Sequence, residues 1–486
     1  MQSRLTRLSS WWNSRCGGAE VLRVAMPMIV SVGSLAVMQF ADRVFLTWYD
    51  PISVGAAFGS GQFLWMLASF PFSVAAYAVA FVSQYNGAKA YQRIGQLVWQ
   101  GIFIGAIVAP LFFLAYPYVS SIFNFFGHSP EVVELENTYF FWSLWGIGFV
   151  VASQGAEAFF VGRKKMKTVM TVSLVAVTCN ILLNYIMIFG AGGFPRMGVA
   201  GAALATSICQ IFRFLILLVL MFIDDFCSGH RYRIMRGCRI VPREFLALLK
   251  YGGMGGTQYF LEMATFTFFV FLLGKLGDVS STSSAIALNL NAMTFLPIVG
   301  IGTAVMTLVG NALGEGSPQL ARRSVFSATW LASIFTGFFL LIFLLVPDVF
   351  LSVYEMGNPE KFAPYYGMTK NLLRFVAVYL FFDTINIIFC SAIRGAGDTK
   401  FVMIVTFALV PFLAIFPWLG VGVFHFGVYW CWTVMTVYIS LLGIIFFARF
   451  MRGAWMEMGL VEPKKGDGFP LGKTAAFQQQ NDGEVS

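Results

Sequence analysis

The chain has 486 residues, of which 58% are hydrophobic and only 11% are charged, and its formal net charge is +9. Soluble domains carry about 25% charged residues, so this composition excludes an ordinary soluble protein. Apolar stretches long enough to cross a hydrocarbon core of about 30 Å recur from one end of the chain to the other. The composition therefore indicates an all-α integral membrane protein.

The apolar stretches predict twelve membrane-spanning helices. In chain order they are residues 21–48, 56–82, 97–118, 138–160, 168–190, 199–223, 251–274, 285–313, 325–346, 368–393, 401–420 and 427–449.

The positions of the basic residues predict the orientation of these spans. Twenty-five of the 32 Lys and Arg residues fall in one alternate set of connections, and only Arg196, Lys275 and Lys361 fall in the other. Because Lys and Arg accumulate on the cytoplasmic side, both termini are expected in the cytoplasm. The positive net charge thus reflects topology and anionic lipid, and no nucleic-acid partner is expected.

The two halves of the chain resemble each other. Residues 161–170 follow the fourth predicted span, and similar residues 394–403 follow the tenth, 233 positions later on the same side. This pattern predicts parallel repeats, two pseudo-symmetric six-helix bundles. The expected domains are a cytoplasmic N-terminus (1–20), two bundles (21–223 and 251–450), a cytoplasmic linker (224–250) and a disordered cytoplasmic tail (451–486).

Four acidic residues lie inside predicted spans: Asp42, Glu157, Glu262 and Asp383. A carboxylate in hydrocarbon costs at least about 2.5–3.5 kcal/mol, so such residues mark ion paths or paired structural sites. Glu157 lies near the inner end of its span, close to the basic residues 163–167, and this position favours a snorkelling or salt-bridged structural acid over a transport residue.

Glu262 and Asp383 are the strongest candidates for a cation site. Both fall near the middle of the membrane in the second half of the chain. Two hard oxygen ligands suit Na⁺, whereas desolvation would let either carboxyl carry a proton. Tyr379, one helical turn before Asp383, either faces a cation with its ring or bonds the acid with its hydroxyl. Asn289 offers another oxygen ligand or a structural bond between helices.

Asp42 is the corresponding candidate in the first half. It is expected to bind a proton or a cation, or to form a structural hub with Asn180 and Asn184. Three glutamines in spans either line a cavity or bond a neighbouring helix. They are Gln39, Gln62 and Gln258.

Several stretches in matching order and spacing resemble the MATE family of multidrug and toxin extrusion transporters. They are residues 26–42, 194–206, 285–289 and 393–399, within a resemblance that covers about residues 20–450. The resemblance implies two six-helix bundles around a central cavity, and export of cationic or amphipathic molecules in exchange for Na⁺ or H⁺. It implies a monomeric multi-pass protein of the cell (inner) membrane that has no enzymatic activity and no cofactor besides the coupling ion.

The acids also indicate a branch of that family. NorM-like members use acids in helices one, seven and ten, where this chain has Asp42, Glu262 and Asp383. DinF-like members pair the first-helix aspartate with another in helix five, where this chain has Asn180 and Asn184. The resemblance is therefore to the NorM-like branch and favours Na⁺ coupling.

Two alternatives stay open. A lipid-linked oligosaccharide flippase of the same superfamily would need cations to hold a diphosphate, and the candidates within spans are Arg43, Arg213, Lys370 and Arg374. A membrane-embedded lipid-modifying enzyme finds less support, because the sequence has no nucleophile motif and no metal-ligand spacing.

Overall fold

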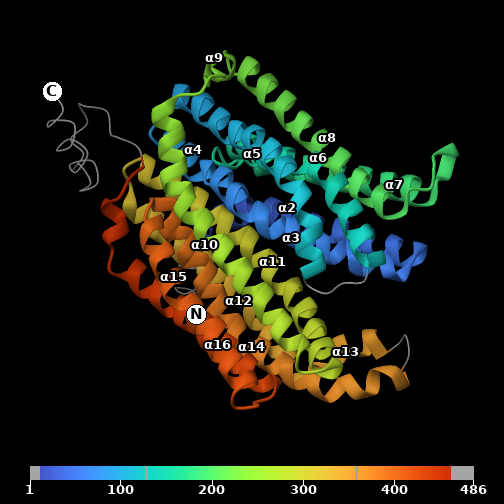
Figure 1. The fold of residues 1–486 in the computed structure, drawn as a ribbon. Coiled ribbons are helices and arrows are strands. Elements are labelled where there is room, and N and C mark those ends of the chain that lie inside the picture. Colours follow the sequence, from blue (N-terminus) through green and yellow to red (C-terminus); the bar gives the residue numbers. More distant parts are fainter. Residues whose placement is uncertain (1–10, 126–129, 356–358, 461–486) are drawn as a thin grey trace. The chain divides into compact units, whose positions relative to one another are not determined.

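The computed structural model describes residues 11–125, 130–355 and 359–460. These residues form helices and connections without a strand, and twelve of the helical segments are long and apolar enough to cross a membrane (Figure 1). The predicted all-α class and the twelve spans are confirmed. Residues 1–10 of the predicted cytoplasmic N-terminus and residues 461–486 of the predicted disordered tail lie outside the described residues.

The bounds of the spanning helices are as follows: α2 (Gly18–Tyr49), α3 (Pro51–Ala76) continued by α4 (Ala78–Gly87), α5 (Tyr91–Phe125), α6 (Pro130–Val161), α7 (Met166–Phe189), α8 (Gly198–Cys227), α10 (Pro242–Gly274), α11 (Asp278–Gly314), α12 (Pro318–Leu345), α14 (Pro359–Ala396), α15 (Thr399–Gly422) and α16 (Val428–Met451). Shorter helices complete the set: η1 (Ala191–Gly193), α9 (Ile234–Gly237), α13 (Asp348–Glu355) and η2 (Ala454–Glu457).

Most spanning helices extend beyond the apolar runs that predict them. In α10, for example, the helix begins at Pro242, whereas the apolar run begins at residue 251. Proline is favoured in the first helical turn, and Glu244 in that turn places a negative charge near the helix N-terminus. The first turns of α10 are too polar to be detected by hydropathy.

The chain divides into two compact units. The N-terminal unit is Val30–Phe260, and the C-terminal unit is Met1–Ile29 together with Leu261–Ser486. The division groups residues by their contacts, and its boundaries fall inside two helices. They lie between Ile29 and Val30 in α2 and between Phe260 and Leu261 in α10. The predicted bundle boundaries, which fall between spans, stay a prediction.

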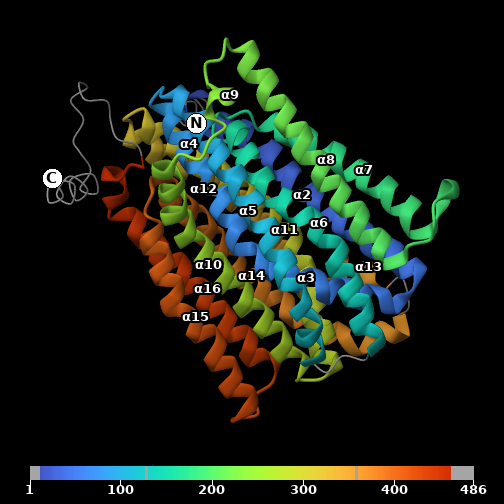
Figure 2. The same ribbon diagram turned by 45° about the horizontal axis from the view of Figure 1, so that its top comes forward.

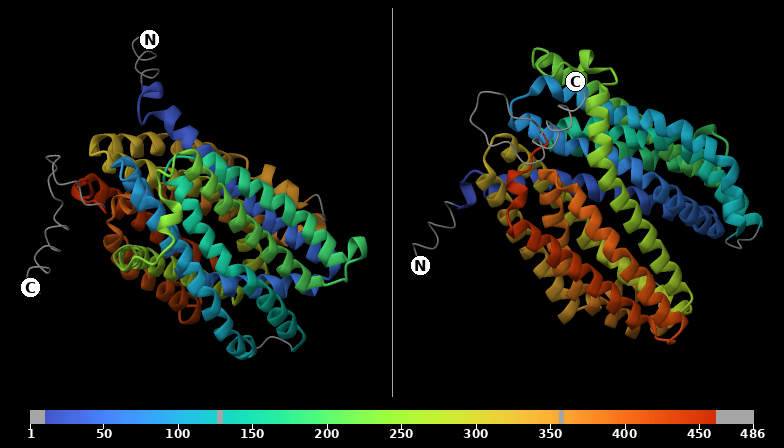
Figure 3. Two further views of the ribbon diagram at one scale, coloured as in Figure 1. Left: turned by 90° about the horizontal axis from the view of Figure 1, so that it is seen from above. Right: turned by 60° about the vertical axis from the view of Figure 1, so that its left-hand side comes forward.

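Each unit is built around one helix. In the N-terminal unit α6 packs against α3, α5 and α8, and in the C-terminal unit α14 packs against α11, α12 and α16 (Figures 1 and 2). α15 completes the C-terminal unit beside α16, and the right-hand view of Figure 3 shows these orange-red and red helices side by side. α6 and α14 are the fourth spans of the two halves, so the repeated halves place the same span at the centre.

The connection between α8 and α10 is held against the N-terminal unit. Asp225 accepts hydrogen bonds from the backbone N–H groups of Tyr232 (2.8 Å) and Ile234 (3.1 Å). On α5, the indole N–H of Trp99 donates to the Ile234 carbonyl at 3.0 Å, and the Gln100 amide donates to the Arg239 carbonyl at 3.0 Å. The predicted linker is therefore an ordered part of this unit over these residues.

A seam of small residues lets α5 and α6 approach closely. A Cβ atom placed on Gly155 would lie 2.6 Å from the backbone nitrogen of Ile102 and 2.7 Å from the carbonyl carbon of Gly101. One on Gly105 would lie 2.5 Å from the backbone nitrogen of Ala152. In membranes, such contacts between small residues let helix backbones pack closely and take the place of a hydrophobic driving force.

Replacing Gly155 should therefore destabilise the N-terminal unit. Gly155→Ala places a methyl group against the α5 backbone, and overpacking of this kind costs about 1–3 kcal/mol. The matched control is Gly337→Ala in α12, because nothing lies within 4 Å of a Cβ at that position. Thermal unfolding of the purified variants in detergent should show a lower midpoint for Gly155→Ala only. Equal midpoints for the two variants would contradict the close approach.

Candidate functional site

Asp42 lies in a closed polar network between three helices of the N-terminal unit. From α7, the Asn184 side-chain amide donates to one oxygen of Asp42 on α2. The Thr206 hydroxyl on α8 donates to the other oxygen at 3.4 Å. Asn184 also donates to the Asn180 carbonyl oxygen at 2.9 Å, and the Asn180 amide donates to Thr206 at 3.2 Å. The structure thus brings Asp42, Asn180 and Asn184 together, which is the contact that the structural-hub alternative expects.

The network fixes the orientation of the Asn184 amide. Its NH₂ group donates to both Asp42 and Asn180, so its carbonyl oxygen points away from both. Asn184 is fully buried, and this oxygen has no hydrogen-bond partner among the described residues. A buried acceptor without a donor is costly, and a proton donor or a cation would satisfy it.

Thr206 was not among the predicted site residues. The sequence gives one signal for it, since Thr206 ends one of the stretches that resemble the family. Its contact with residues of α2 and α7 depends on how three helices pack, and spacing along the chain does not reveal that.

Asp383 and Glu262 approach each other in the C-terminal unit. Asp383 on α14 is buried, and the Asn386 side-chain amide donates to it at 3.3 Å. Glu262 on α10 is half-buried, and its carboxylate lies close enough to Asp383 for an electrostatic interaction between the two side chains. The Glu262 carboxylate also lies within electrostatic reach of Tyr438 on α16. The predicted pair of carboxylates therefore lies within electrostatic reach, and Asn386 and Tyr438 are additional polar neighbours.

Tyr379 is buried one turn before Asp383, but its hydroxyl forms no hydrogen bond with the described residues. Its ring lies beside that of Trp432 on α16, with centroids 6.4 Å apart. The Trp432 indole is fixed by a hydrogen bond of 3.1 Å to Ser284. The aromatic side chain therefore has a defined position, and its hydroxyl stays available to a ligand.

The remaining predicted residues differ in exposure. Asn289 is exposed on α11, and the described residues show no hydrogen bond from it to the acids. Gln258 is buried, Gln62 is half-buried and Gln39 is exposed. Their roles in lining a cavity stay predictions.

Glu157 is paired, as the sequence predicts, but with a different partner. It forms a buried ion pair with Arg213, which joins α6 to α8. Of the basic residues near Glu157 in sequence, Arg163 and Lys165 instead pair with Asp224. The sequence favours these neighbours because they are close along the chain, whereas the structure selects a cation 56 residues away.

The Glu157–Arg213 pair should be needed for stability. Glu157→Gln leaves the Arg213 guanidinium buried without a counter-charge, at a cost of about 3–5 kcal/mol. Glu157→Gln combined with Arg213→Met removes both charges and should recover most of that loss. Thermal unfolding of Glu157→Gln, Arg213→Met and the double variant, each compared with the wild type, gives the coupling energy. A single variant as stable as the wild type would show that the pair contributes nothing.

A family model, MatE, matches the chain twice, over residues 27–186 and 256–419, about two thirds of its length. The two matches fall one in each half, at the positions of the predicted repeats.

Relatives with known names cover most of the chain. "Probable multidrug resistance protein NorM" of Chromobacterium violaceum is 27% identical over 88% of this chain and 92% of its own length. "Multidrug resistance protein MdtK" of Klebsiella pneumoniae is 26% identical over 80% of this chain and 84% of its own length.

Solved structures share the fold. The crystal structure of the eukaryotic MATE transporter AtDTX14 superposes with a TM-score of 0.80 at 20% identity, over 90% of this chain and 96% of that one. An outward-facing multidrug resistance MATE family transporter superposes with a TM-score of 0.81 at 17% identity, over 92% of this chain and 98% of that one.

Proposed function

Because the chain belongs to the MatE family and is a multi-pass membrane transporter rather than an enzyme, we propose that it is a secondary antiporter that exports organic cations or drugs in exchange for Na⁺ or H⁺. The named relatives, which are multidrug resistance proteins, support this substrate class. No cofactor besides the coupling ion is required.

One observation carries the proposal: each unit contains buried or half-buried carboxylates held by neutral polar groups. Asp42 is bonded by Asn184 and Thr206, and Asp383 is bonded by Asn386 near Glu262. Among the described residues, neither Asp42 nor Asp383 forms an ion pair with a Lys or Arg. Since a carboxylate in hydrocarbon is costly, a site of this kind favours binding of a cation or a proton.

The C-terminal cluster is the proposed Na⁺ site. Two neighbouring carboxylates repel each other, and a cation between them removes that repulsion while it gains hard oxygen ligands. The buried Tyr379 hydroxyl and the Asn386 amide are further ligand candidates. A proton shared by the two acids would also remove the repulsion, so H⁺ is the alternative coupling ion.

The Asp42 cluster is proposed to handle a proton or the cationic substrate. It lies in the other unit, and the Asn184 carbonyl oxygen is available there. Ion and substrate need not touch, because a ligand shifts a conformational equilibrium by its differential affinity for the two states.

The flippase alternative is weakened by the partners of its candidate cations. Arg213 pairs with Glu157, and Lys370 pairs with Asp348 at 2.9 Å. The Arg43 guanidinium lies 5.0 Å from the centroid of the Phe58 ring. Arg374 donates to Asn371 at 3.2 Å. A lipid diphosphate would have to displace these partners.

Substitution of the acids tests the proposal. Glu262→Gln and Asp383→Asn should abolish efflux of a cationic dye driven by a Na⁺ gradient, because each removes a ligand charge. Asp348→Asn is the matched control, since Asp348 lies outside the spans. Efflux from reconstituted vesicles under separate Na⁺ and pH gradients identifies the ion. Normal efflux by both variants would exclude the C-terminal cluster as the coupling site.

The same assay separates the two clusters. Asp42→Asn should impair transport while calorimetry of the purified variant still detects Na⁺ binding at the C-terminal cluster. Loss of both would mean a single merged site, provided that thermal unfolding shows the variant to be folded.

The proposed orientation places both termini in the cytoplasm, and native cysteines make it testable. Cys227 and Cys238 are exposed at the connection that contains α9. They should resist an impermeant maleimide added to intact cells and react with it in inverted vesicles. In a Cys227→Ser/Cys238→Ser background, Glu131→Cys should react from outside, and Lys400→Cys should not. The reverse labelling pattern would overturn the orientation.

A further inference from the structure

The segment that precedes α2 is attached to α12. The Trp11 indole N–H donates to the Ser327 hydroxyl at 3.2 Å, and that hydroxyl donates to the backbone carbonyl of Cys16 at 3.0 Å. Arg323 hydrogen-bonds to the hydroxyl of Ser14. The rings of Trp11 and Trp330 meet edge to face, with centroids 5.7 Å apart. All of these contacts lie within the C-terminal unit.

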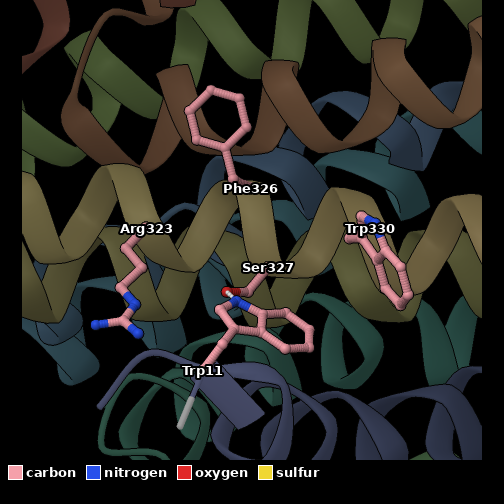
Figure 4. A pocket seen from close by; sticks show the side chains of 5 residues that line it. All are labelled: Trp11, Arg323, Phe326, Ser327 and Trp330. Atoms are coloured by element: carbon pink, nitrogen blue, oxygen red, sulfur yellow. Dashed lines mark hydrogen bonds between the residues drawn. The ribbon is translucent and has the colours of Figure 1, made fainter. Parts of the chain in front are cut away.

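This attachment creates a pocket of about 350 Å³ lined by Trp11, Arg323, Phe326, Ser327 and Trp330. Figure 4 shows that Arg323, Phe326, Ser327 and Trp330 come from one helix and that Trp11 reaches toward Ser327 from the adjacent segment. Arg323, Phe326 and Trp330 are three or four residues apart, so they follow one face of α12. The pocket therefore has a cation at one end and aromatic rings along its length.

Residues around the pocket extend both its apolar surface and its positively charged end. Phe326 and Trp330 are exposed, at 39% and 54%. Arg322 is exposed beside Arg323, and its guanidinium lies 5.6 Å from the centroid of the Phe326 ring. Arg15 is neutralised by an ion pair with Glu315, but the structure shows no acid ion-paired with Arg322 or Arg323 among the described residues. Two positive charges thus stand at the end of an apolar surface.

We propose that this pocket binds one anionic phospholipid. The phosphate lies at Arg323, whose planar guanidinium matches phosphate oxygens, with Arg322 as a second cation. One acyl chain follows Phe326 and Trp330 for about 10 Å, the rise of seven helical residues. Trp11 forms the opposite wall, so the bound lipid fastens the N-terminal segment to α12.

Charge complementarity and place in the fold select this occupant. The pocket opens at the first turns of a spanning helix, where acyl chains and headgroups are the surrounding solvent, and tryptophan is enriched at such interfaces. Basic pockets between or beside spanning helices on the cytoplasmic side bind anionic headgroups. A zwitterionic lipid offers the same acyl chain without the net charge, so preference for an anionic headgroup is the property to measure.

Lipid quenching on the full-length chain in detergent tests both the preference and the place. Phosphatidylglycerol with brominated acyl chains, added at a few equivalents, should quench part of the tryptophan fluorescence, at concentrations about tenfold lower than brominated phosphatidylcholine. In Trp330→Phe this quenching should fall, and the remainder should come from Trp11, which lines the same pocket. Trp418→Phe is the matched control, because Trp418 is 50% exposed on α15, and it should leave the quenching unchanged.

The basic residues are tested separately. Arg322→Gln/Arg323→Gln should reduce the preference for phosphatidylglycerol by about tenfold, which is the loss of a charge-assisted hydrogen bond. Arg236→Gln, which removes an exposed arginine of the other unit, should not change it. Equal quenching by both lipids in the wild type, or an unchanged preference in the double variant, would overturn the proposal. Equal quenching by the two lipids in the wild type overturns the proposal even if a variant fails to fold, and the folded variants locate the site.

Discussion

A polar group inside a bilayer has no water to bind, so it must find its partner within the protein. This requirement explains why the described spans are helices, because each helix satisfies its own backbone. It also explains the side-chain contacts that join the helices. Thr336 and Thr384 share a hydrogen bond of 2.7 Å between α12 and α14, and Glu157 and Arg213 join α6 to α8. The packing of the helices therefore also provides the partners that their buried polar side chains need.

The two halves share a scaffold but not their acids. A shift of 233 positions places Glu157 opposite Cys390 and Asp383 opposite Val150. α6 and α14 occupy the same central place, yet α6 carries a carboxylate paired with arginine, and α14 carries one bonded to asparagine. The repeated halves thus share the packing of their helices. The acidic residues differ between the halves, so the chemistry of the two units differs.

The spans and the acids could be predicted because their signals are local. A long apolar run predicts a helix, and a carboxylate within it is visible at once. Partners were harder to predict. Arg213 contacts Glu157, and Thr206 contacts Asp42, because separate helices pack together. The spacing of these residues along the chain does not indicate either contact. The polar start of α10 was missed for the opposite reason, since its residues form a helix without being apolar enough to span a membrane.

The division of the chain within α2 and α10 has a mechanical consequence. A helix with residues in both units is a continuous covalent connection between them. Residues that weaken a helix lie near the division in both: Pro27 lacks an N–H group two residues before it in α2, and α10 has four glycines between residues 252 and 256, of which Gly252 and Gly256 pack against the backbone of α3. Glu262 follows the division in α10 by two residues. The carboxylate proposed for ion coupling therefore lies next to the boundary between the two units, six residues after the last of these glycines.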